Sequence, residues 1–508
     1  MARVGGAGRF LGFVLVLPLK ALAILAMVGV PLVGVWVASS IAALRNGPVW
    51  LTVLCGLLLF PLLPALWETW SAWSRSRKSK PKARILTTGD RLILRTLLLS
   101  AGFLAALLSA QPSAAFTALS ARGDWMLRGR KDARANAVRA GLFKAASKLE
   151  WLYLAAHDNP FRKYAKQEPT PDPKPQATAK PSSAPAASGS PPSAPVPSGS
   201  ATRAPTEPPV VPAPPPELDS WHLPGELHPA VTSMPPGSES SIRAVAESLT
   251  ARVPAPFERL KAVHDWVADR VSYDVPALSS GNMPPQDAET VFRTRQSVCA
   301  GYAQLLAALG RAAGLEIVYV TGDARAQTND LSGVGHAWNA ARIGAEWYLL
   351  DATWDSGYVT GSHFERRYST EYFLTPARVF GVDHFPDEAK WQLLAKPLSR
   401  GEFLRQPAMS PRFFASGLEL LSPDRSQVDV QGELAIAIRN PLGVFVMASF
   451  SARGTEPREP PPCQVVNGQN TQVRCKFPEP GRYDVRLFTN KEAFGTFTFT
   501  GQLQANSN

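Results

Sequence analysis

Three long apolar stretches near the N-terminus constrain the fold of this chain most strongly. They run from Phe10 to Leu44, from Val49 to Trp67 and from Thr96 to Leu119. Each is long enough to cross ~30 Å of hydrocarbon, which takes about 20 helical residues. The first could instead be a signal peptide, but it is longer than the apolar part of such a peptide and a second apolar stretch follows almost at once. We expect residues 1–121 to form a membrane domain with about three transmembrane helices.

The positive charge of the chain is concentrated in the same region. Residues 1–165 contain 22 Lys and Arg against 6 Asp and Glu, whereas the remainder contains 31 against 35. The net charge of +12 is therefore typical of basic residues that flank membrane segments, and it does not indicate a nucleic-acid partner.

The distribution of basic residues also predicts the orientation. The loop at residues 74–84, SRSRKSKPKAR, is dense in Lys and Arg and is expected on the cytoplasmic side. Three crossings from a cytoplasmic N-terminus would then put everything after Ala121 outside the cytoplasm. If Phe10 to Leu44 instead forms a re-entrant pair around Pro18 and Pro31, this orientation fails.

Two segments separate the membrane domain from the globular part. Residues 122–165 place Val138, Leu142 and Leu149 at roughly helical spacing among basic residues, which predicts an amphipathic juxtamembrane helix on the lipid headgroups or on the helical bundle, without chemistry of its own. Residues 166–217 are rich in Pro, Ala and Ser. They cannot bury enough apolar surface to offset the entropy of ordering, so we expect a disordered linker.

Globular patterning resumes in residues 218–400, where one cysteine marks a candidate nucleophile. In QSVCAGYAQLLAALGRAAGL, residues 296–315, Ser297 could cap a helix whose first turn contains Cys299 and which Gly314 ends. The first turn of a helix stabilises a thiolate and offers backbone N–H groups to an oxyanion. A lone cysteine, however, is more often a core residue.

The stretch GHAWNAARIGAEWYLLDATWD, residues 335–355, supplies partners for this cysteine. It is predicted to form two strands joined by a type II′ turn at Gly344. In that register His336 faces Thr353 and Trp338 faces Asp351, so His336 and Asp351 are diagonal neighbours within hydrogen-bonding reach. This is the arrangement of base and orienting carboxylate that a thiol nucleophile needs. The alternative is a structural histidine and a strand-end aspartate.

The chain has Cys299 at a helix start, then GHAWN and then WYLLDATWD. These three motifs, in this order, resemble the transglutaminase-like superfamily. The segment YFLTPARVFGVDHFPDEAKWQLL, residues 372–394, is similar to bacterial and kyphoscoliosis-peptidase-type members, and the resemblance covers residues 240–400. It implies a papain-like α+β fold with Cys299 as nucleophile, His336 as base and Asp351 as the residue that orients it.

The resemblance also suggests residues that contact the substrate. Gln296 is an expected oxyanion donor, and Trp338 and Trp354 are expected to shape the acyl channel, although either tryptophan could be plain core. No cofactor and no metal site are expected, because the seven histidines form no HxxxH or HExxH pair and CxxC does not occur.

Residues 401–508 alternate short β-like runs with Pro and Gly, which predicts a small β-sandwich. A five-residue loop at Asn467 to Thr471 would bring Cys463 opposite Cys475, so a disulfide is expected in an oxidising space. Two reduced core cysteines are the alternative. The sandwich could bind a protein partner or only brace the catalytic domain.

The sequence therefore predicts a helical membrane anchor, an extracytoplasmic α+β transglutaminase-like domain and a C-terminal β-sandwich. The expected function is cysteine-dependent acyl transfer or hydrolysis on peptide or isopeptide amides, with membrane lipid as the surroundings of the anchor. Hydrolysis is favoured slightly over transfer, because nothing in the sequence marks an amine site. A binding or scaffold protein that uses the same cleft without turnover is the competing class.

Overall fold

The computed structural model describes residues 7–45, 47–77, 86–130, 132–166, 225–325, 333–430, 432–455, 457–489 and 492–501, with only the backbone for residues 7–19 and 492–501. Nearly all of the predicted linker at 166–217 and most of the basic loop at 74–84 lie outside these residues.

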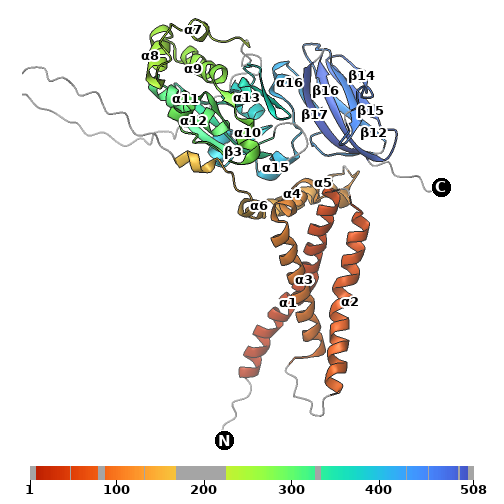
Figure 1. Ribbon diagram of the computed structural model, residues 1–508. Coiled ribbons are helices and arrows are strands. Elements are labelled where there is room, and N and C mark those ends of the chain that lie inside the picture. Colours follow the sequence, from red (N-terminus) through yellow and green to blue (C-terminus); the bar gives the residue numbers. More distant parts are fainter. Residues whose placement is uncertain are drawn as a thin grey trace, which may run out of the picture.

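The N-terminal region forms three long helices that lie side by side (Figure 1). These are α1 (Ala7–Leu44), α2 (Val49–Ser76) and α3 (Thr88–Ala110). All three are long and apolar enough to cross a membrane. Helix α1 is continuous, so the alternative of a re-entrant pair within it is not what the structure has.

The predicted bounds of the third segment, Thr96 to Leu119, were wrong. Helix α3 starts earlier because Thr87 and Asp90 form a capping box, which satisfies backbone N–H groups at that end. It ends at Ala110, because Gln111 leaves the helical region with φ −145° and ψ 60° ahead of Pro112, and proline disfavours a helical residue before it. Residues Pro112–Arg122 form a separate, largely buried helix, α4.

Residues 123–166 form several short helices where one amphipathic helix was predicted. They are η1 (Trp125–Leu127), α5 (Ala133–Ser147), α6 (Glu150–Ala156) and η2 (Arg162–Lys166). Gly129, with φ 74°, adopts a left-handed conformation that separates η1 from α5. In Figure 1 helices α4 to α6 lie between the three long N-terminal helices and the globular domains.

Ion pairs fasten this helical layer to the C-terminal part of the chain. Arg122 Nη2 lies 2.7 Å from Asp429 Oδ1, and Arg425 Nη1 lies 2.8 Å from Asp124 Oδ2. Burial alone would raise the pKa of Asp124, but Arg425 and Arg139 outweigh it and lower that pKa. The globular domains are thus docked on this helical layer through charged pairs that are largely shielded from water.

The domain that contains Cys299 is a five-stranded antiparallel sheet with helices packed on it. The strand order is β8 (Phe373–Thr375), β5 (Glu346–Leu350), β4 (Val334–Ile343), β3 (Glu316–Ala324) and β9 (His384–Pro386). The remaining elements of this region are α7 (Pro229–Thr232), α8 (Ile242–Arg252), α9 (Pro256–Arg270), β1 (Ser272–Tyr273), α10 (Val275–Ser280), α11 (Ala288–Thr294), β2 (Gln296–Ser297), α12 (Cys299–Ala312), α13 (Ala352–Ser356), β6 (Gly357–Thr360), β7 (His363–Arg366), α14 (Ala377–Phe380) and η4 (Ala389–Gln392).

Helix α12 packs against β3 and β4 and is the centre of this domain. Its residues Tyr302, Leu305, Leu306 and Leu309 are fully buried, as expected for an apolar stripe of helical period. They share one hydrophobic core with Val263, Trp266 and Val267 of α9. This packing holds the N-terminus of α12 close to the sheet.

The predicted hairpin register is correct, but only over the strands themselves. Asn339 faces Leu350 and Ile343 faces Glu346, with Gly344 at φ 63° in the turn. Strand β5 ends at Leu350, and α13 begins at once, so the predicted cross-strand pairs His336 with Thr353 and Trp338 with Asp351 were wrong.

The change from strand to helix at this point has a local cause. Asp351 Oδ1 accepts a hydrogen bond from the Thr353 backbone N–H at 2.9 Å and caps α13. Such a cap satisfies one of the unpaired N–H groups of a helix start and favours the helix over a continued strand.

The C-terminal region is a β-sandwich, as predicted. After α15 (Arg400–Arg405) and α16 (Pro411–Ala415), one sheet has the order β10 (Glu419–Ser422), β12 (Glu433–Arg439), β15 (Asn470–Lys476), β14 (Gln464–Val466), and the other β11 (Asp429–Val430), β17 (Glu492–Gly501), β16 (Gly481–Thr489), β13 (Met447–Ala452). Their inner faces form one apolar core. Figure 1 shows the sandwich beside the domain that contains Cys299.

The disulfide between Cys463 and Cys475 is present, with the two Cα atoms 4.5 Å apart. Strands β14 and β15 pair from Gln464 with Arg474 to Val466 with Gln472, which leaves the predicted five-residue loop. That prediction is confirmed.

Candidate functional site

Cys299 is the first residue of α12 and only 1% of it is exposed. The prediction that Ser297 caps this helix was wrong. Val298 is the N-cap, and the Ser297 hydroxyl donates instead to the Val298 carbonyl oxygen at 2.9 Å. No side chain caps the helix. The sulfur of Cys299 therefore lies at the N-terminus of α12, where the cap residue accepts no hydrogen bond from the first backbone N–H groups through its side chain.

His336 and Asp351 are brought together, although the cross-strand pairs that predicted their contact do not form. His336 Nε2 lies 2.8 Å from Asp351 Oδ2, and both side chains are buried. With Nε2 directed at the carboxylate, Nδ1 is the ring nitrogen left to accept the proton of Cys299, a hydrogen-bonding neighbour of His336. All three residues of the predicted triad therefore meet in one buried group.

The charge distribution of this group favours a protonated imidazole. Burial by itself lowers the pKa of His336, but the Asp351 carboxylate and Cys299 outweigh it and raise that pKa to about 9. Burial by itself raises the pKa of Asp351, but His336 and His384 lower that pKa by more than burial raises it. The pKa of Asp351 is therefore held below its usual range. An imidazolium beside a thiol stabilises the thiolate, which is the reactive form of cysteine.

His384 supports Asp351 from the other side and was not singled out by the sequence. Its Nε2 lies 3.4 Å from Asp351 Oδ2, and its Nδ1 lies 2.6 Å from Asp383 Oδ1. The Tyr372 hydroxyl donates to Asp383 Oδ2 at 2.7 Å. A chain of hydrogen bonds thus runs from His336 through Asp351 and His384 to Tyr372, and it fixes the position of the orienting carboxylate.

The structure does not bring Gln296 to the nucleophile. Arg295 adopts a left-handed conformation with φ 57° at the end of α11, and the chain continues as β2. Because side chains alternate along a strand, Ser297 is buried and Gln296 is exposed.

A different glutamine, Gln286, is buried at the start of α12. It is 1% exposed. Its Oε1 accepts from the Val298 backbone N–H at 3.1 Å, and its Nε2 donates to the Pro284 carbonyl oxygen at 2.9 Å. The only sequence signal was a glutamine in the proline-rich loop ahead of α11.

The two tryptophans differ in their surroundings. Trp338 is 1% exposed and packs with Val320 and Phe380, so it lies in the core behind His336. Trp354 is half-buried, and its ring centroid is 5.3 Å from that of His336 and 4.5 Å from that of His384. Of the two, Trp354 is the residue placed to line a path to the base.

His336, Asp351 and His384 each offer a metal ligand atom, and these atoms lie within 4.8 Å of one another. In the structure the same atoms satisfy each other by hydrogen bonds. An ion bound among them would replace the bond between His336 and Asp351 that the triad requires. The expectation that catalysis uses no metal stays a prediction.

Residues from the helical layer at 123–166 cover the cysteine. Phe161 and Tyr164, which are 2% and 7% exposed, pack with Val298, Cys299 and Ala300 in one apolar cluster. This contact was not predicted, since residues 122–165 were expected to carry no chemistry.

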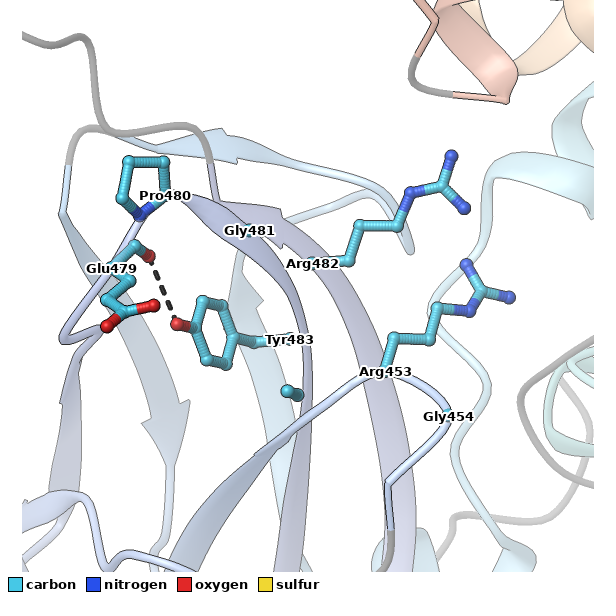
Figure 2. A pocket seen from close by; sticks show the side chains of 8 residues that line it. Arg453, Gly454, Glu479, Pro480, Gly481, Arg482 and Tyr483 are labelled. Atoms are coloured by element: carbon cyan, nitrogen blue, oxygen red, sulfur yellow. Dashed lines mark hydrogen bonds between the residues drawn. The ribbon is translucent and has the colours of Figure 1, made fainter.

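A hollow of about 520 Å³ opens on the sandwich, between Arg453–Gly454 and Glu479–Tyr483. In Figure 2 Arg453 and Arg482 point in the same direction, away from the Tyr483 hydroxyl, which donates to the Glu479 carbonyl oxygen at 3.0 Å. Arg482 Nη2 reaches the Leu44 carbonyl oxygen at 3.3 Å. This hollow contains no residue of the Cys299 group.

Comparison with known proteins places these features in families. The family model "Transglutaminase-like superfamily" matches residues 243–352, and the model "KY-like, immunoglobulin-like domain" matches residues 400–499. Kyphoscoliosis peptidase of Mus musculus is 33% identical over 223 residues, which are 42% of this chain and 34% of that protein. The Homo sapiens protein of the same name is 31% identical over 211 residues, 40% of this chain and 32% of that protein.

A solved structure described as "Crystal structure of a TGase" shares 24% identity, with a TM-score of 0.21, over 27% of this chain and 36% of that chain. This chain spans about a third of the length of the kyphoscoliosis peptidases it matches. Residues 243–352 therefore belong to the transglutaminase-like superfamily, and the chain combines this domain with three N-terminal apolar helices and an immunoglobulin-like C-terminal domain.

Proposed function

We propose that this chain is a membrane-anchored, cysteine-dependent acyl-transfer enzyme that acts on peptide or isopeptide amides. The observation that carries the proposal is the 2.8 Å contact between His336 Nε2 and Asp351 Oδ2, which leaves the other ring nitrogen for Cys299 at a helix start. The name of the kyphoscoliosis peptidases agrees with this reaction class.

The reaction proceeds through a thioester. His336 takes the proton of the Cys299 thiol, and the thiolate attacks the amide carbonyl carbon. The imidazolium then gives its proton to the leaving amine as the carbon–nitrogen bond breaks. In a hydrolase His336 next deprotonates a water that cleaves the thioester to an acid, whereas in a transferase an amine takes the place of water. Asp351 stabilises the imidazolium at each stage.

Two residues are proposed to assist at the reacting carbon. Gln286, buried beside the start of α12, replaces Gln296 as the side chain proposed to support the oxyanion site. Trp354 forms one wall of the acyl path next to His336.

We propose that the catalytic domain is outside the cytoplasm. Three membrane-long helices are an odd number of crossings, and the basic residues between the second and third favour a cytoplasmic loop. The Cys463 to Cys475 disulfide is of the kind that persists in oxidising compartments.

A binding protein without turnover is the second candidate. The observation that favours it is the exposure of Cys299, only 1%, which denies a substrate access in this arrangement. Labelling with small electrophiles, followed by mass spectrometry, distinguishes an enzyme from a binding protein. An enzyme should be labelled at Cys299 and should form a mass-identified acyl adduct with an activated ester, and both should require His336. Equal labelling with and without His336, and no adduct, would leave binding as the function.

A second free cysteine would also react in the labelling experiment, and a substitution removes this background signal. Among the described residues, Cys55 is exposed and free, and Cys299 is the other free cysteine. A Cys55→Ala background therefore reports Cys299 alone, with Cys299→Ala as the blank.

A further inference from the structure

Residues 157–164, here called the strap, follow α6, include the first residues of η2 and pass over Cys299. Their aromatic side chains, Phe161 and Tyr164, lie in the cluster that contains Cys299 and Ala337. The strap lies just before residue 166, the last described residue of the helical layer at 123–166. It therefore belongs to the anchor in sequence and to the catalytic site in space.

Asn159 anchors the strap beside the base. Its Nδ2 donates to the Gly322 carbonyl oxygen at 2.7 Å and to the His336 carbonyl oxygen at 3.3 Å, while its Oδ1 accepts from the Phe161 backbone N–H at 2.9 Å. It is 2% exposed. A Cβ at Gly335 would lie 2.9 Å from Asn159 Oδ1 and from Pro160 Cδ, so only glycine leaves room for the strap at that position.

The catalytic domain also binds the backbone of the strap. The Tyr319 hydroxyl donates to the Phe161 carbonyl oxygen at 3.1 Å, and Gln304 Nε2 donates to the Tyr164 carbonyl oxygen at 2.6 Å. Burial and the charge of Cys299 raise the pKa of Tyr319 above its usual value, which keeps its hydroxyl a donor. Phe161 and Tyr164 lie in a 3₁₀ turn, in which the Tyr164 backbone N–H donates to the Phe161 carbonyl oxygen at 3.1 Å, so the two side chains lie on the same side of the strap.

Two contacts with aspartates hold the strap at His157 and at Arg162. Arg162 forms a paired contact with Asp387, Nε to Oδ2 at 2.8 Å and Nη2 to Oδ1 at 2.6 Å. His157 Nε2 lies 2.6 Å from Asp323 Oδ1. The contact of Arg162 with Asp387 is the more exposed of the two, since 41% of the Arg162 side chain is accessible.

We propose that the strap occupies the substrate groove of Cys299 as an intramolecular pseudosubstrate, and that the groove takes a peptide turn with two aromatic side chains three residues apart. The inference rests on the proposed function. Its physical basis is that the strap buries the thiol. The surface under the strap also supplies side chains that donate hydrogen bonds to peptide carbonyl oxygens, and apolar residues that pack against a peptide of this kind. Turnover then requires the strap to leave the groove, either with movement of the anchor or by competition from substrate.

The first test measures access to the thiol and does not depend on turnover. In full-length protein with Cys55→Ala, the double variant Asn159→Ala and Arg162→Ala should be labelled by iodoacetamide at Cys299 about tenfold faster, because it loses hydrogen bonds and an ion pair that hold the strap. Arg162→Ala alone should give a smaller rise. Lys148→Ala, which removes the same charge from an exposed position of the same layer, is the matched control and should be labelled at the original rate.

The second test addresses the substrate class. A synthetic peptide of residues 157–165, HDNPFRKYA, should protect Cys299 of the double variant from iodoacetamide. The same peptide with both aromatic residues replaced by Ala should protect at least tenfold less. Unchanged labelling in the double variant, with an unchanged melting temperature, would overturn the strap as a cover. Equal protection by both peptides would overturn the aromatic specificity.

The outcome separates this inference from the proposed function. Faster labelling and protection by the aromatic peptide, without any acyl adduct from an activated ester of that peptide, would support the groove and its occupant while removing the enzymatic role. An adduct that forms equally fast in the wild type and in the double variant would retain the enzyme and overturn the strap.

Discussion

His336 Nε2 and Asp351 Oδ2 lie 2.8 Å apart, although one residue belongs to a strand and the other caps a short helix. The helix cap uses the second carboxylate oxygen of Asp351, which accepts from the Thr353 N–H. One side chain thus closes the strand, starts α13 and orients the proposed base. Replacing it affects local structure and chemistry together, so tests of this site need variants that keep its shape.

The triad variants should differ in severity. Cys299→Ala should abolish acyl-enzyme formation, His336→Ala should nearly abolish it, and Asp351→Asn should leave a measurable rate reduced by roughly 10²–10⁴-fold. Asparagine keeps an oxygen for the Thr353 N–H but cannot hold the imidazolium as a carboxylate does. Adduct formation by mass spectrometry is the measurement, with thermal unfolding to check folding. Full biological activity of Cys299→Ala would show that the cleft only binds.

The two glutamines should separate clearly. Gln286→Ala should lower the acylation rate by about 10²-fold, a typical effect for losing an oxyanion-site group, because it also releases the Val298 N–H at the start of α12. Gln296→Ala should leave the rate within about twofold, since its side chain is exposed. Rates measured at saturating ester distinguish slower chemistry from weaker binding. A larger loss for Gln296→Ala would restore the assignment made from sequence.

The stability of the folded protein should fall between neutral and alkaline pH. The pKa of His336 is raised to about 9 in the folded state, against about 6.5 for an unperturbed histidine. Its contribution is therefore fully present below pH ~6.5 and is lost as the pH rises through 9, by up to on the order of 3 kcal/mol. Melting temperatures from pH 6 to 10 should decline more for wild type than for Asp351→Asn. The opposite order would contradict the proposed ion pair.

Loss of the disulfide should destabilise the sandwich alone. Replacing Cys463 and Cys475 by serine opens a loop with a sequence separation of 12, which in the chain-entropy model lowers the free energy of unfolding by ~3 kcal/mol. Limited proteolysis of the sandwich and its thermal unfolding measure the effect, while labelling at Cys299 should not change. Non-reducing peptide mapping that finds both thiols free in protein from its native compartment would refute the bridge and weaken the proposed orientation.

Protease added to intact cells or spheroplasts should cut the predicted linker at 166–217, because the proposed orientation puts it on the outer side. A tag on the N-terminus should stay protected until the membrane is lysed. Protection of the linker under the same conditions would reverse the orientation.

Local patterns were sufficient for a large part of the fold. The apolar stretches, the helix that begins at Cys299, the hairpin register through Gly344 and the Cys463 to Cys475 bridge all depend on residues close together in sequence. Their periodicity and turn chemistry restrict the backbone to few conformations, so the same short segments that reveal them also determine them. Cys299, His336 and Asp351 could be found because each lies at the boundary of such an element.

Only the tertiary structure decided which other side chains meet that group. Gln286 rather than Gln296 is buried at the start of α12, because one left-handed residue at Arg295 sets the direction of the following strand. His384 reaches Asp351 through the pairing of β9 with β3. Phe161 packs with Cys299 although the predicted linker separates the two residues in sequence. Contacts between segments far apart in sequence arise from how elements pack, and the pattern within any one segment does not contain that information.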